Sequence, residues 1–179
     1  TQHLIKSLSL AEGKDSSFTT LAKNLQPTFP VSIGSRRSQI KGDWPYIFFD
    51  TPNERSSEDF SSRIDLKSVK VSSEGGRVKI VFSSLTSGPF SGDLVCHIYD
   101  GSPLLYWEAV MSSEKSKVAY IYEGLFQTEV PTIVYKDNKT KQIVRERPSK
   151  EAKPLKVVHR TVMAEYPSGT IAFFPPPHA

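Results

Sequence analysis

The chain has a single cysteine, Cys96, among its 179 residues, so it cannot form an internal disulfide bond. This count excludes a small scaffold held by disulfides, and it fits either a cytosolic protein or a secreted one with an adequate core. Long apolar runs are also missing, because no segment approaches the ~20 residues that a membrane-spanning helix needs. No helical period is sustained over about eleven residues. We therefore expect little helix and no insertion into a membrane.

The motifs of common catalytic centres are absent as well. The sequence has no HExxH or GxSxG motif, no paired CxxC and no glycine loop for phosphate. The histidines are not spaced as ligands of one metal ion. They are His3, His97, His159 and His178. We expect neither a metal site nor a cofactor.

Alternation of apolar and polar residues dominates what is present. The alternating segments are 3–10, 18–25, 46–49, 64–72, 77–83, 92–99, 104–112, 117–122, 131–136, 141–145, 155–165 and 170–174. Tight turns join several successive segments, which favours antiparallel pairing, and each segment has one apolar face to bury against another sheet. The sequence therefore predicts an all-β fold. It is a two-layer antiparallel β-sandwich of ten or more short strands, in a single domain over residues 1–179, with a solvated connection at 53–62.

The strongest local signal is the Asp100-Gly101 dipeptide in the middle of residues 92–111. Asp-Gly favours a two-residue hairpin loop in which both central residues take positive φ. The resulting register pairs Tyr99 with Ser102, His97 with Leu104, Val95 with Tyr106, and Asp93 with Glu108. One face of this hairpin is apolar, with Leu94, Cys96, Ile98, Leu105, Trp107, Ala109 and Met111. The other face is polar, with Asp93, His97, Tyr99, Tyr106 and Glu108.

The polar side of the hairpin is the first candidate for a functional site. Carbohydrate sites need aromatic planes that stack on sugar C–H groups and planar polar groups that bind hydroxyls, and this side offers both. Trp44, beside Pro45 at a strand entrance, is a second candidate platform. The predicted ligand-binding residues are Trp44, Asp93, His97, Tyr99, Tyr106 and Glu108. Both candidates also have a structural explanation, since cross-strand tyrosines stabilise sheets and a tryptophan can fill a core.

Two pairs on the polar side have the residue types of acid–base catalysis. Glycoside chemistry commonly uses two carboxyl groups roughly 5–9.5 Å apart, and directly opposed Asp93 and Glu108 would be close enough. His97 with Glu108 is the other pair. A solvated carboxylate at a strand start is the simpler interpretation of Asp93, so no catalytic residue is assigned.

The charge of the chain is mild, with a formal net charge of +4 from 23 basic and 19 acidic residues. The most basic stretch, 136–160, is interrupted by Asp137, Glu146 and Glu151, and Tyr135 is the only aromatic residue near it. Nucleic-acid surfaces concentrate positive charge and interleave aromatic side chains. We therefore expect no nucleic-acid partner.

Residues 101–109 (GSPLLYWEA) and 118–125 (VAYIYEGL) resemble the strand pairs of large β-sandwich domains of the galactose-mutarotase-like class. The resemblance extends over about residues 44–125. Domains of this class begin many secreted polysaccharide hydrolases and lyases, often before a helical catalytic domain. The resemblance therefore implies a carbohydrate partner and a secreted or periplasmic location. Mutarotases use a catalytic His and Glu, which no motif of this chain places, so no catalytic role is carried over.

The ends of the chain suggest a piece of a longer protein. Residue 1 is not methionine, and the proline run 175–177 is typical of a linker to a further domain. Our first hypothesis is a carbohydrate-binding or substrate-supporting domain of a larger secreted polysaccharide-processing protein. One alternative is a sugar hydrolase, lyase or epimerase with its own active site. Another is a structural or adhesion module whose edge strands and Phe173-Phe174 bind a neighbouring protein domain.

Overall fold

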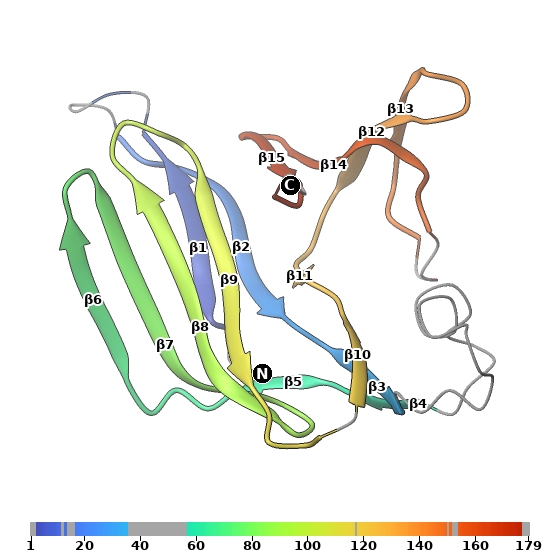
Figure 1. Cartoon of the computed structure of the whole chain (residues 1–179). Helices are drawn as coiled ribbons and strands as arrows, with labels where there is room; N and C mark the ends of the chain where they lie inside the picture. The colour runs from blue at the N-terminus through green and yellow to red at the C-terminus, as the bar shows by residue number, and fades with distance from the viewer. Residues whose placement is uncertain are drawn as a thin grey trace. The chain divides into compact units, whose positions relative to one another are not determined.

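The structure is a computed structural model that describes residues 3–11, 13, 17–35, 57–116, 118–149, 151 and 154–176 (Figure 1). These residues form fifteen short strands in four antiparallel sheets and no helix, so the predicted all-β, sandwich-like antiparallel fold is confirmed. Within the same ranges, no helix is present that could span a membrane. Trp44 and the candidate strand 46–49 lie outside the described residues.

The chain divides into two compact units. Unit 1 comprises Thr1–Gln26 and Phe126–Ala179, and unit 2 comprises Pro27–Leu125. Unit 1 holds most of the residues of β1 (Ile5–Leu10), β2 (Thr19–Thr28), β11 (Leu125–Gln127), β12 (Thr132–Asp137), β13 (Ile143–Glu146), β14 (Val157–Tyr166) and β15 (Gly169–Phe173). Unit 2 holds β3 (Val31–Ser35), β4 (Ser57–Phe60), β5 (Ser62–Ile64), β6 (Val69–Glu74), β7 (Arg77–Ser87), β8 (Phe90–Tyr99), β9 (Leu105–Ser112) and β10 (Val118–Tyr122). A single domain over residues 1–179 stays a prediction.

The main sheet of unit 1 has the strand order β13-β12-β14-β15. Alternation along β12 and β14 buries Val134 and Ala164, which are 5% and 3% exposed. At the end of β12, one carboxylate oxygen of Asp137 accepts hydrogen bonds from the backbone N–H of Thr140 at 2.7 Å and of Lys139 at 2.9 Å. These bonds hold the pKa of Asp137 below its ordinary value of 3.8, and the bond from the Thr140 backbone has the largest effect. The carboxylate therefore closes the turn between β12 and β13.

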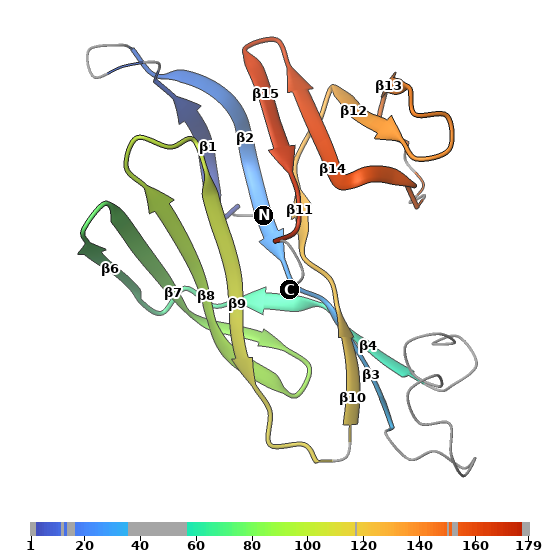
Figure 2. The ribbon, with the colours of Figure 1, turned by 45° about the horizontal axis from the view of Figure 1, so that its top comes forward.

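The main sheet of unit 2 has the order β5-β7-β8-β9, with β6 also paired to β7 (Figure 2). Gly75, with φ +58°, supplies the positive φ of the tight turn between β6 and β7. Strand β8 is central and buries side chains on both faces. Leu94, Val95, Cys96 and His97 are between 0% and 5% exposed. Strand β6 lies at the edge, and all six of its residues are exposed.

The register between β8 and β9 differs from the predicted one by two residues. The observed pairs include His97 with Tyr106, Val95 with Glu108, and Asp93 with Val110. Of the two loop residues only Gly101 takes positive φ, and β9 begins after Pro103, which has no N–H for the ladder. The predicted cross-strand pairs are therefore wrong. A shift of two residues returns each side chain to its predicted side, so the apolar and polar sides of the hairpin are confirmed.

Residues 57–60, predicted to lie in a solvated connection, form the strand β4. This strand pairs with β3 in an antiparallel ladder. Ser32 Oγ of β3 donates a hydrogen bond to the carboxylate of Asp59 at 2.6 Å. Backbone pairing to β3 therefore keeps this polar segment extended. Because the segment has no alternating apolar residues, its sequence does not predict a strand.

Candidate ligand-binding face

One side of the β6–β9 sheet collects most of the predicted site residues. Directly opposed residues of paired strands share a side, and the ladders place Arg77 beside Tyr99, Lys79 beside His97, and His97 beside Tyr106. We call this side the polar face. It comprises Glu74, Arg77, Lys79, Asp93, His97, Tyr99, Tyr106 and Glu108.

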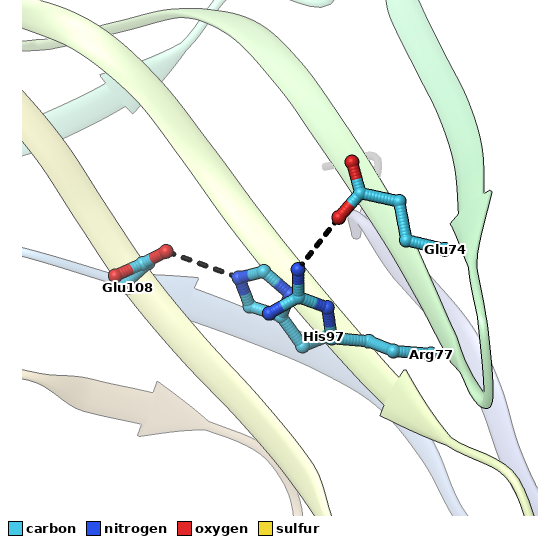
Figure 3. Close-up of polar contacts among 4 residues, drawn as sticks. All are labelled: Glu74, Arg77, His97 and Glu108. Atoms are coloured by element: carbon cyan, nitrogen blue, oxygen red, sulfur yellow. Dashed lines mark hydrogen bonds and ion pairs between the residues drawn. The ribbon is translucent and has the colours of Figure 1, made fainter.

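A buried histidine holds a carboxylate at the centre of the polar face (Figure 3). His97 Nε2 lies 3.0 Å from Glu108 Oε1. The side chain of His97 is 7% exposed, whereas that of Glu108 is 36% exposed. Because a carboxylate oxygen only accepts, Nε2 is the donor of this bond. The contact fixes one oxygen of Glu108 and leaves part of its carboxylate open to solvent.

The remaining ring nitrogen of His97 is also buried. Nδ1 has no hydrogen-bond partner among the described residues. In the neutral tautomer that carries its proton on Nε2, Nδ1 is an acceptor, so that tautomer buries no N–H without a partner. Neither nitrogen is therefore available to a molecule in solution: Nε2 is engaged by Glu108 and Nδ1 is covered.

Two tyrosines form the exposed aromatic part of the polar face. The ring of Tyr106 stacks on the imidazole of His97, with ring centroids 5.8 Å apart and an interplanar angle of 26°. Tyr106 is nevertheless 39% exposed, and Tyr99 on the adjacent strand is 37% exposed. The stack restrains Tyr106 from one side, so its accessible part is a preorganised aromatic surface.

The structure adds an ion pair that sequence reasoning missed. Arg77 donates to Glu74 at 2.9 Å across the turn between β6 and β7 (Figure 3). Arg77 pairs with Tyr99, which brings a guanidinium to the aromatic part of the polar face. The signal was the Gly75-Gly76 turn, which sets the β6–β7 register, together with the alternation of 77–83.

Asp93 is half-buried and lies opposite Val110, not opposite Glu108. Glu108 pairs instead with Val95. Diagonal positions of this kind have Cα atoms roughly 7–8 Å apart, which removes the directly opposed carboxyl pair that the predicted register implied. The contact that the structure does form is the one between His97 and Glu108.

The described residues offer neither a metal-binding cluster nor an activated thiol. They contain no group of three or more His, Cys, Asp or Glu side chains that could hold a metal ion. Cys96 is 3% exposed, and its burial raises the pKa of the thiol to about 11. The thiol is therefore protonated at neutral pH, which disfavours it as a nucleophile.

Unit 1 has an open groove of about 620 Å³ beside β2. Its walls include Lys23, Asn24, Glu129 and Tyr166. Among the described residues the hydroxyl of Tyr166 has no hydrogen-bond partner, and it is buried, so it is closed to a solute in the groove. None of the predicted site residues that the structure describes lines this groove.

Comparison with family models, with curated proteins and with solved structures found no match to this chain. The likeness to galactose-mutarotase-like domains stays a prediction, and the site is argued from its own geometry.

Proposed function

We propose that unit 2 binds carbohydrate, without transforming it, on the polar face of the β6–β9 sheet. The observation that carries the proposal is the grouping of a half-exposed, restrained Tyr106 with a carboxylate anchored by His97. Sugars present C–H patches flanked by hydroxyl pairs. An aromatic ring stacks on the first, and a fixed carboxylate oxygen accepts from the second.

The arrangement also gives each group a role. Tyr106 and Tyr99 supply the stacking surface, and their exposed fractions of 39% and 37% leave room for a ligand on the sheet. Glu108 accepts from a hydroxyl through the part of its carboxylate that His97 does not occupy. Arg77 adds a donor at the Tyr99 end. His97 acts as a positioning residue, because it is buried and touches the ligand only through its two neighbours.

Burial argues against extending the proposal to catalysis. A hydrolase, lyase or epimerase that used His97 as its acid or base would need a ring nitrogen within reach of the substrate. One nitrogen of His97 is bonded to Glu108 and the other is covered. The wider setting, a larger secreted or periplasmic polysaccharide-processing protein, stays a prediction from the resemblance.

The proposal is tested by a screen on a glycan array followed by affinity electrophoresis on the retained polysaccharides. We expect Tyr106→Ala to weaken binding about tenfold, since a stacked aromatic contact of this kind contributes about 1.4 kcal/mol. Tyr106→Phe, which keeps the ring, should bind nearly as the parent does. Tyr122→Ala is the matched control, because Tyr122 is a 69% exposed tyrosine on β10.

Absence of retention on every polysaccharide would overturn the proposal. So would equal loss of binding in the Tyr106→Ala and Tyr122→Ala variants.

A further inference from the structure

The outer edge of β6 is an open row of backbone hydrogen-bonding groups. In the β6–β7 ladder, Ser83 N donates to Ser68 O at 3.1 Å, which fixes which residues face β7. In an antiparallel pair only every second residue of a strand bonds to the neighbouring strand. Because Ser68 bonds to β7, the N–H and C=O groups of Val69, Val71 and Ser73 point away from β7. No other described strand pairs with β6, and the edge carries neither a proline nor a bulge (Figure 1). Such an edge is a template for another strand.

We propose that two copies of this chain pair antiparallel through β6, around a two-fold axis at Ser72. In this register Val71 of each protomer lies opposite Ser73 of its partner, and both residues direct their N–H and C=O groups outward. The ladder therefore closes with the groups that β7 leaves unused. An isologous contact of this kind is self-terminating, so it gives a dimer and not a fibre.

Charge complementarity selects this register and favours a second copy as the occupant. It places Lys70 of each protomer opposite Glu74 of its partner, on the same side of the extended sheet. If the register between the two β6 strands shifts by two residues, Lys70 lies opposite Ser72 of the partner. If it shifts by two more in the same direction, the Lys70 side chains of the two protomers lie opposite each other. Opposed unlike charges stabilise antiparallel pairs, and like charges destabilise them. The six-residue segment is thus complementary to its own reverse.

The apolar side of β6 supports the same arrangement. Val69 and Val71 are 49% and 67% exposed, on the side of the sheet that carries Ile80 and Phe82. A partner strand would cover part of both valines. One pair of six-residue edges forms a narrow interface, so we expect a dissociation constant on the order of tens of micromolar.

Sedimentation equilibrium of the full chain tests the proposal with the variants Lys70→Glu and Glu74→Lys. Each variant opposes like charges in its own dimer, so we expect each alone to dimerise at least about tenfold more weakly than the parent. An equimolar mixture of the two restores unlike charges across both positions. We expect the mixture to form heterodimers with nearly the parental affinity.

A second variant tests the backbone contact without changing charge. Val71→Pro removes an outward N–H that β7 does not use, and it should abolish the dimer. Lys136→Glu, on the exposed part of β12, is the control for charge reversal elsewhere.

Three outcomes would overturn the proposal. The parent could remain monomeric at several times the expected dissociation constant, the β6 variants could dimerise like the parent, or the mixture could fail to recover.

Discussion

Strands β8 and β6 belong to the same sheet and are separated only by β7, yet their side chains lie in different environments. Both alternate in sequence, but β8 buries Leu94, Val95, Cys96 and His97 in succession, whereas every residue of β6 is exposed. Alternation decides the side of the sheet to which a residue points. Position in the sheet decides whether that side is covered. A histidine on a polar-looking strand can therefore be a core residue when that strand is central.

The largest contrast is expected between Leu94→Ala and Val71→Ala. Leu94 is 0% exposed, so its truncation leaves a cavity and should lower the free energy of unfolding by about 3 kcal/mol. Val71 is 67% exposed, and its truncation should change stability by less than about 0.5 kcal/mol. Urea unfolding measures both. Equal costs would show that the two strands do not differ in burial.

Alanine substitutions at Gly92 and Gly75 compare the stability cost of a steric overlap with that of an unfavourable backbone conformation. A Cβ at Gly92 of β8 would overlap Val110 O of β9, so Gly92→Ala must displace the ladder and should cost about 2 kcal/mol. Gly75, at the end of β6, has open space but φ +58°, and Gly75→Ala should cost about 1 kcal/mol. Thermal unfolding of both variants checks the order. A larger cost at Gly75 would contradict the close approach of β8 and β9.

The contact between His97 and Glu108 can be measured by a double-mutant cycle. His97→Ala, Glu108→Ala and the double variant should give a coupling energy of about 1.5 kcal/mol, at the lower end of what a hydrogen bond with one charged partner contributes. The matched cycle on Arg77 and Glu74, which are 40% and 74% exposed at their side chains, should give less. A coupling energy near zero for the first cycle would mean that Glu108 is not held.

The smallest effect at neutral pH concerns Cys96. Its thiol is protonated in both the folded and the unfolded chain below pH 9, and burial raises the pKa to about 11 in the folded chain only. The stability that this shift contributes is fully present below pH 9 and is lost as pH rises from 9 to 11. Cys96→Ala should remove this loss in denaturant titrations at pH 8 and pH 10.

A labelling experiment sharpens the same point. Cys96 of the folded protein should react slowly with a thiol reagent at pH 8, whereas Val71→Cys in a Cys96→Ala background should react rapidly. Fast labelling of Cys96 would contradict the burial of β8.

The local pattern was enough to predict the two strands of the central hairpin and the side to which each residue points, but it missed β3, β4 and β11. The alternation in 92–99 and 104–112 placed Tyr106 and Trp107 on opposite sides of the hairpin, and the ladder agrees. The register was not predictable from Asp100-Gly101 alone, because Pro103 delays the start of β9 and lengthens the loop. A register shift of two residues leaves every side chain on the same side of the sheet, so the alternation of apolar and polar residues cannot distinguish the two registers.

Burial and long-range pairing also lay beyond the local pattern. The ring of His97 stacks on Tyr106 and bonds to Glu108, both on β9, and no property of 92–99 reveals these neighbours. Strand β10 pairs with β3, which is distant from it in the sequence. Arg77 reaches the polar face through pairing with β8. These features depend on which strands are neighbours, and sequence reasoning did not assign neighbours outside the central hairpin.

Protection from tyrosine nitration tests most directly whether carbohydrate binds on the polar face. With a retained polysaccharide present, Tyr99 and Tyr106 should be nitrated more slowly, while Tyr122 should react at an unchanged rate. Unchanged modification of Tyr106 with polysaccharide bound, or equal protection of Tyr122, would contradict the proposed binding face.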